Sequence, residues 1–194
     1  MLNLRITTGT AKNKRLKCPK IPDFRAVQEI AKSAIFSILG ESVLGATCLD
    51  LFAGSGNMGI EALSRGASWC DFVDENPKST QAIKKNLQNT GLVERADVYK
   101  DEAVKFVGNC PNFYDIVFVD PFYDDVKHKF LMEMLQEAIS DNGIVVFLHG
   151  DKMNMENLIK KTDFKVVESR KYGKSCVDFL TKDSPSQTED KTYT

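Results

Sequence analysis

The run Asp120-Pro121-Phe122-Tyr123 combines residue types that can orient a planar amine for attack on an electrophile. An amino group on an aromatic base is a weak nucleophile because its lone pair is delocalised into the ring. The carboxylate of Asp120 and a backbone carbonyl could accept the two amine hydrogens and aim that lone pair, while Pro121 stiffens the loop. Phe122 keeps a ring plane available, and Tyr123 could stack on the base. We therefore predict a catalytic segment made of Asp120, Pro121, Phe122 and Tyr123, which a base must reach by flipping out of structured nucleic acid.

A second stretch has the glycine spacing of a nucleotide-binding turn. Gly54, Gly56 and Gly59 follow the apolar run 47–52 and lead into an expected helix, which is the context that a GxGxxG pattern requires. Asp74 stands 20 residues after Gly54, at the end of the next expected strand, where a carboxylate can accept both hydroxyl protons of a ribose. The two signals together predict a nucleoside-bearing cofactor.

The charges around this turn favour one cofactor over another. Asp50, near the carboxyl end of the first strand, would repel the pyrophosphate of a dinucleotide but attract the ammonium and sulfonium of S-adenosylmethionine. The Asp101-Glu102 pair follows the third strand and offers a carboxylate to an adenine amino group, and either residue could provide it. We predict S-adenosylmethionine rather than NAD. The expected cofactor contacts are Asp50, Phe52, Gly54, Ser55, Gly56, Gly59, Asp74, Glu75, Asp101 and Glu102.

The elements that must position these residues alternate regularly along the chain. Five apolar runs with strand character are separated by segments of helical periodicity, which predicts an α/β fold with a mostly parallel sheet covered on both faces. Two further strands, 164–168 and 175–180, are joined by a tight turn and must be antiparallel. We therefore predict a seven-stranded sheet with one reversed strand. An N-terminal hairpin and a helix from residue 24 to 39 precede it, so the expected division is 1–40 for this extension, 41–182 for the main domain and 183–194 for a flexible tail.

Length and composition are those of one ordinary globular domain with a small extension. The chain has 194 residues, 42% hydrophobic and 27% charged, with a formal net charge of −1. Five cysteines without CxxC spacing predict reduced core residues in a cytoplasm. Neither a membrane span nor an apolar signal core is expected, and His128 and His149 lack partners at metal spacing, so neither is predicted to be a ligand or a base.

Positive charge is concentrated near the N-terminus. Residues 1–38 contain eight basic and two acidic residues, although the whole chain is nearly neutral. Since phosphate contacts supply sequence-independent affinity, this segment is predicted to dock RNA. The expected RNA contacts are Arg5, Lys12, Lys14, Arg15, Lys17, Arg25 and Lys32.

The run CLDLFAGSGNMGIEALSRGA at 48–67, DPFY at 120–123 and RITTGTAKNKRLKCP near the N-terminus resemble the RsmD-type family of 16S ribosomal RNA guanine-N2 methyltransferases. The resemblance covers residues 4 to 182. It implies a Rossmann-like class I methyltransferase fold, S-adenosylmethionine as methyl donor, and 16S ribosomal RNA or the small ribosomal subunit as partner of a monomeric cytoplasmic enzyme without a metal. Asn13 stands where the family has a second hairpin glycine, and we expect the turn to persist because asparagine tolerates left-handed backbone.

Two other functions fit parts of the pattern. A related loop could present a DNA adenine, another ribosomal RNA guanine or a glutamine side chain to the same methyl donor, although the basic N-terminal segment favours RNA. The Gly-rich turn could also belong to a non-catalytic nucleotide-binding module, and the Asp-Pro-aromatic-Tyr loop argues against this.

Overall fold

The computed structural model describes residues 4–22, 27–110, 112–121 and 127–182. The strands are β1 Leu4–Arg5, β2 Arg15–Leu16, β3 Thr47–Leu51, β4 Trp69–Val73, β5 Ala96–Tyr99, β6 Tyr114–Val119, β7 Ile139–Gly150, β8 Phe164–Tyr172 and β9 Ser175–Lys182. The α-helices are α1 Glu29–Leu39, α2 Asn57–Ser64, α3 Pro77–Thr90, α4 Ala103–Gly108, α5 Lys127–Ala138 and α6 Met155–Ile159. Short 3₁₀ turns lie at Gly40–Val43 and Val93–Arg95.

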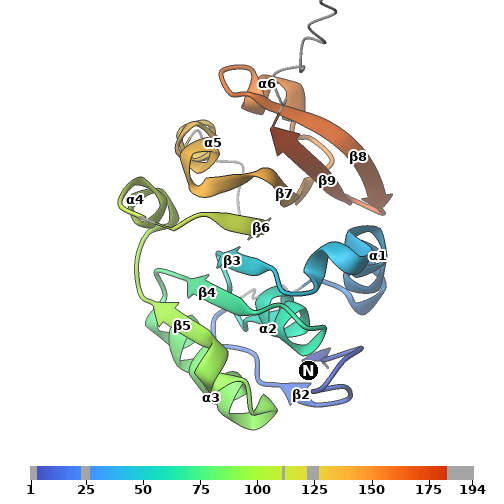
Figure 1. Ribbon diagram of the computed structural model, residues 1–194, viewed down its shortest axis with the longest axis vertical. Helices are drawn as coiled ribbons and strands as arrows, with labels where there is room; N and C mark the ends of the chain where they lie inside the picture. Colours follow the sequence, from blue (N-terminus) through green and yellow to red (C-terminus); the bar gives the residue numbers. More distant parts are fainter. Residues whose placement is uncertain (1–3, 23–26, 111, 122–126, 183–194) are drawn as a thin grey trace, which may run out of the picture.

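The seven strands from β3 to β9 form one sheet in the order β5-β4-β3-β6-β7-β9-β8 (Figure 1). β9 pairs antiparallel with both β7 and β8, and the other neighbouring pairs are parallel. The predicted seven-stranded sheet with one reversed strand is therefore confirmed. The apolar run Ile144–Leu148 predicts the start of β7 at Ile144, but the strand begins five residues earlier, at Ile139, which pairs with Tyr114 across an irregular register.

Helices cover both faces of this sheet. Side chains of α1, α2 and α3 belong to one buried apolar cluster, and those of α4, α5 and α6 belong to a second one on the opposite face. In Figure 1, α4 and α5 flank the sheet on one side, with α1 and α2 on the other. Since each central strand is apolar on both faces, its residues are buried along almost the whole length. No helix of the described residues is long and apolar enough to cross a bilayer.

The N-terminal hairpin packs directly on α2. β1 and β2 pair antiparallel, and Asn13 in their connection has a φ of 67°, which confirms that asparagine supports the turn. Gly9 has a φ of +85°, and a Cβ there would lie 1.8 Å from the carbonyl oxygen of Ser64. Only glycine permits this approach. Leu4, Ile6 and the hairpin's other apolar residues join the cluster that contains α1 and α2.

The ends of α1 and α3 follow their local sequence. Pro77 opens α3, the Asn76 side chain accepts a hydrogen bond from the backbone N–H of Lys78, and Gly91 ends the helix with a φ of 77°. α1 ends at Leu39, before Gly40, as predicted. It begins at Glu29, after Gln28 in an extended conformation, so the prediction that the helix includes Val27 is wrong, and Phe24 lies outside the described residues.

Candidate functional site

Three carboxylates lie at the carboxyl ends of three neighbouring strands. Asp50 is in β3, Asp74 follows β4 directly and Asp120 follows β6 directly. In the sheet register, Leu51 of β3 pairs with the last residue of β4 on one side and with the last residue of β6 on the other. The chain leaves β3 toward β4 and later returns to β6 on its other side. This is the switch point at which open α/β sheets bind their ligands.

The Gly-rich loop, residues 53–56, is held from the β4 side by Asp74. Its Oδ2 accepts a hydrogen bond from the backbone N–H of Gly54 at 2.8 Å, and its Oδ1 accepts one from that of Asn76 at 2.8 Å. Each carboxylate oxygen has a second lone pair, so Asp74 can organise the loop and still receive ribose hydroxyls. Burial raises the pKa of Asp74, and the hydrogen bonds from Asn76 and Gly54 act in the opposite direction.

The backbone just before this loop is unusual. Phe52 has a φ of 57°, a region that bulky residues rarely occupy, and Gly54 and Gly56 have φ values of 57° and 75°. Such strain persists only where the surrounding structure enforces it, and it concentrates at ligand sites. Phe52, Gly54, Ser55 and Gly56 thus form a sharply folded turn between β3 and α2.

Asp50 caps the helix that follows the loop. Its Oδ2 accepts a hydrogen bond from the backbone N–H of Gly59 at 2.9 Å, in the first turn of α2. A Cβ on Gly59 would come within 2.4 Å of Phe72, so glycine allows the helix to approach the sheet this closely. Burial raises the pKa of Asp50 well above its ordinary value, and the nearby charges of Asp120 and Asp74 raise it further.

The electrostatics of the three carboxylates favour a cationic ligand. Burial raises the pKa of Asp120 to about 7. The ion pairs among the described residues involve other acids, so within this part of the chain no Lys or Arg neutralises the three carboxylates. A ligand with a positive charge would relieve their mutual repulsion. The donor set therefore fits S-adenosylmethionine and disfavours a pyrophosphate.

The predicted adenine contacts lie beyond β5. Asp101 Oδ1 accepts hydrogen bonds from the backbone N–H of Glu102 at 2.9 Å and from Lys105 Nζ at 3.2 Å. Glu102 and Glu75 are exposed. The choice between Asp101 and Glu102 as adenine partner stays a prediction.

Of the predicted catalytic segment, Asp120 and Pro121 are described, and Phe122 and Tyr123 lie outside the described residues. At the turn after β3 the structure brings together aromatic rings that sequence spacing did not connect. His128 is buried, with ring centroids 6.3 Å from Phe52 and 6.2 Å from Phe147, both in edge geometry. Because these contacts span α5, the β3 turn and β7, no local sequence pattern could reveal them.

The predicted RNA contacts divide into four groups, of which the buried Lys32 is the last. Lys12, Lys14, Arg15 and Lys17 are exposed on the hairpin. Arg5 is half exposed and donates two N–H groups to Glu29. Arg25 lies outside the described residues.

The prediction for Lys32 is wrong, because its side chain is buried. Lys32 is 1% exposed, and its Nζ lies 3.0 Å from Glu61 Oε2. It also donates to the carbonyl of Arg5 and to Asn57 Oδ1. All of its hydrogen-bonding capacity is used inside the protein, so it offers nothing to a phosphate.

Two buried asparagines beside the Gly-rich loop were not among the site residues predicted from the sequence. Asn86 Nδ2 donates to the carbonyl of Ser55 at 2.8 Å, and Asn57 Nδ2 donates to that of Val27 at 3.3 Å. Asparagine is unfavourable inside helices. The sequence did contain a signal for the burial of Asn86, because this polar residue lies on the same helical face as the apolar Ile83.

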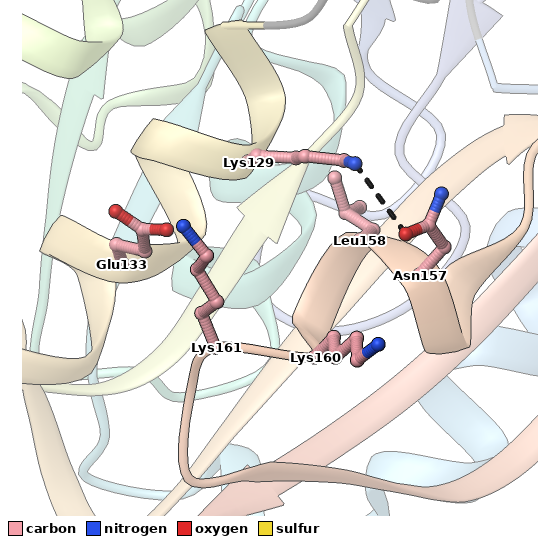
Figure 2. A pocket seen from close by; sticks show the side chains of 6 residues that line it. All are labelled: Lys129, Glu133, Asn157, Leu158, Lys160 and Lys161. Atoms are coloured by element: carbon pink, nitrogen blue, oxygen red, sulfur yellow. Dashed lines mark hydrogen bonds between the residues drawn. The ribbon is translucent and has the colours of Figure 1, made fainter.

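A separate hollow lies between α5 and α6 (Figure 2). It is lined by Lys129, Glu133, Asn157, Leu158, Lys160 and Lys161. Lys129 Nζ donates to Asn157 Oδ1 at 3.4 Å. The hollow thus presents three lysines on the face opposite to α2 and the hairpin.

Known proteins resemble this chain along most of its length. The family model described as "Conserved hypothetical protein 95" matches residues 4–181. "Ribosomal RNA small subunit methyltransferase D" of Escherichia coli (strain K12) is 32% identical over 140 residues, covering 72% of this chain and 68% of that protein. YlbH of Bacillus subtilis (strain 168), provisionally named an rRNA methyltransferase, is 31% identical over 175 residues, covering 88% and 94%. The solved structure of Escherichia coli yhhF, provisionally named a methyltransferase, covers 95% of this chain and 100% of that chain with a TM-score of 0.81 at 23% identity. This likeness confirms the expected Rossmann-like fold.

Proposed function

The chain belongs to the family described as conserved hypothetical protein 95, and we propose that it methylates the exocyclic N2 amine of a guanine in 16S ribosomal RNA, with S-adenosylmethionine as donor. The observation that carries this proposal is the group of three buried carboxylates around the Gly-rich loop, in a chain 32% identical to a protein named for small-subunit ribosomal RNA methylation. We propose that it acts as a monomer in the cytoplasm.

The cofactor is assigned to the turn between β3 and α2. When bound, S-adenosylmethionine supplies a methyl group on a positively charged sulfur. Asp74 would receive the ribose hydroxyls, and Asp101 or Glu102 the adenine amino group. Asp50 would provide negative charge beneath the loop, with Phe52, Ser55, Glu75 and the glycines as neighbours. Burial of these carboxylates strengthens their attraction to a cation, because fewer water molecules screen it.

Asp120 is assigned to the acceptor amine. Its carboxylate would accept one amine hydrogen and hold the nitrogen lone pair toward the methyl donor. A pKa of about 7 would also let Asp120 take the proton that the amine loses when it is methylated. Pro121, Phe122 and Tyr123 complete the proposed acceptor loop, with Tyr123 stacked on the base.

The exposed hairpin cations are assigned to the RNA backbone. Lys12, Lys14, Arg15 and Lys17 lie on the hairpin, which packs on α2 beside the cofactor turn. Arg5 and Arg25 are kept in the proposal as secondary contacts. A phosphate held here would fix the position of the RNA relative to the methyl donor without specifying its sequence.

The test offers tritiated S-adenosylmethionine to the purified protein with four substrates: small ribosomal subunits from cells that lack this enzyme, naked 16S RNA, DNA and bulk protein. We expect label in the RNA, and nucleoside digestion should release N2-methylguanosine. An Asp120→Asn variant serves as the control for contaminating activity. Label in protein or DNA, or in another nucleoside, would overturn the proposed substrate.

A further inference from the structure

The Gly-rich loop and the N-terminal basic segment, residues 4–22, are joined through one buried side chain. Asn86 of α3 is fully buried. Its Nδ2 donates to the carbonyl of Ser55 at 2.8 Å and to the carbonyl of Lys17 at 2.9 Å, and its Oδ1 accepts from the N–H of Lys17 at 2.8 Å. Both amide hydrogens and the amide oxygen are therefore engaged, on the loop and on the segment together.

Side chains from two different elements hold the loop in place. The Gly54 N–H is fixed by Asp74 from β4, whereas the Ser55 carbonyl is fixed by Asn86 from α3. The two bonds thus hold two neighbouring residues of the turn, Gly54 and Ser55, from two different elements. Any shift of Lys17 would therefore be transmitted through Asn86 to the peptide that the cofactor must contact.

A neighbouring asparagine, Asn89 of α3, also bonds to the N-terminal segment but not to the Gly-rich loop. Asn89, one turn further along α3, donates its Nδ2 to the carbonyl of Arg15 at 3.0 Å. It holds the same hairpin strand but makes its bond at an exposed position, and it does not contact the loop. Asn86 alone of this pair connects the two regions.

We propose that Asn86 is a positioning residue that couples the two ligands, so that RNA bound by the basic segment tightens cofactor binding at the loop, and the reverse. This inference rests on the proposed function. The physical basis is that each ligand orders the same hydrogen-bonded unit of Lys17, Asn86 and Ser55, and the second ligand meets a unit already ordered. Because linkage is reciprocal, one coupling factor describes both directions.

The experiment measures the dissociation constant of S-adenosylhomocysteine, by calorimetry on the full chain, with and without saturating 16S RNA. We expect RNA to tighten binding by about 5-fold or more in the wild type, the lower end of typical coupling. Asn86→Ala should bring this factor close to one, and Asn89→Ala should leave it as in the wild type. Circular dichroism and thermal unfolding verify that each variant is folded.

Hydrogen exchange on the wild type provides a second test that needs no variant. S-adenosylhomocysteine alone should slow exchange of the Lys17 N–H, because that group donates to Asn86 Oδ1 and Asn86 in turn holds the Ser55 carbonyl of the Gly-rich loop. A wild-type coupling factor of one, a full factor in folded Asn86→Ala, or no change in exchange at Lys17 would overturn the inference. Methylation of RNA with a coupling factor of one would refute this inference alone, whereas absence of RNA binding and of methylation would refute the proposed function.

Discussion

Lys32 Nζ lies 3.0 Å from Glu61 Oε2, and both side chains are excluded from solvent. Glu61 also accepts hydrogen bonds from the backbone N–H groups of Thr7 and Thr8, and from Arg65 Nε at 2.8 Å. Burial raises the pKa of Glu61, but the charge of Lys32 and these hydrogen bonds more than offset it, so the pKa stays below its usual value. The ion pair thus fastens α1 and the hairpin to α2.

We expect Lys32→Met to reduce the free energy of unfolding by about 3–5 kcal/mol, because it removes one partner of a buried ion pair. Denaturant unfolding followed by circular dichroism measures the loss. The matched control is Arg5→Ala, which removes a solvent-exposed pair with Glu29 and should change stability little. Equal effects of the two substitutions would contradict a stabilising role for the buried pair.

Lys32 shows which part of the structure could not be predicted from the sequence. Strand and helix order could be predicted because apolar periodicity is local. The sequence predicts a helix over 77–90 and a strand over 114–119, and α3 and β6 have these bounds. Lys32 was counted as a surface cation, although it falls on the buried face of α1 one turn before Ile35. Its partner Glu61 is 29 residues away in another helix, and nothing in the sequence pairs them. The burial of Asn86 could be predicted from its place on the apolar face of α3, but its contacts could not, since Ser55 and Lys17 meet only in the folded chain.

Asp74→Ala should weaken S-adenosylmethionine binding by roughly 10- to 150-fold, which corresponds to about 1.5–3 kcal/mol for hydrogen bonds to a charged acceptor. The substitution also frees the Gly54 N–H, which loosens the loop. Calorimetry on the purified protein measures the affinity, and Glu94→Ala, an exposed acid outside the site, serves as control. Unchanged affinity in Asp74→Ala would remove this residue from the cofactor site.

Asp120→Asn should lower the single-turnover rate by at least about 100-fold, within the range that general acid–base catalysis contributes, and keep cofactor affinity within a few fold. Because the active form is the carboxylate, kcat/KM of the wild type should rise with pH up to about 7 and then level off. The variant should lose that dependence. Rapid-quench measurements from pH 5.5 to 8.5 test both points, and a variant with wild-type rates would exclude an amine-orienting role.

The raised pKa of Asp120 also predicts a cost in stability. The folded protein binds the Asp120 proton more tightly than the unfolded chain does. This proton binding stabilises the fold fully below the ordinary aspartate pKa, and the stabilisation is lost as pH rises to about 7. Asp120→Asn removes that cost and should therefore unfold at a higher temperature than the wild type at pH 8, in the absence of cofactor. The gain should shrink toward pH 4. Thermal unfolding at both pH values measures it, and a variant less stable than the wild type at pH 8 would contradict the prediction.

Neutralising Lys12, Lys14 and Arg15 together, as glutamines, should weaken RNA binding and reduce its salt dependence. Each phosphate that the protein no longer neutralises lowers the slope of log affinity against log salt by about 0.7–0.9, so the triple variant should have a slope smaller by about two to three units. Its affinity for S-adenosylmethionine should stay as in the wild type, because all three residues are exposed on the hairpin and none belongs to the proposed cofactor site.

The chain offers a control of equal charge on another face. Lys129, Lys160 and Lys161 line the hollow between α5 and α6 (Figure 2), and changing all three to glutamine removes the same net charge from the protein. A general effect of net charge on RNA association would affect both triple variants alike, whereas docking on the hairpin should affect the N-terminal variant alone. Filter binding of 16S RNA between about 50 and 200 mM salt separates the two cases. An unchanged slope in the N-terminal variant together with a reduced slope in the control would move the RNA surface from the hairpin to α5 and α6.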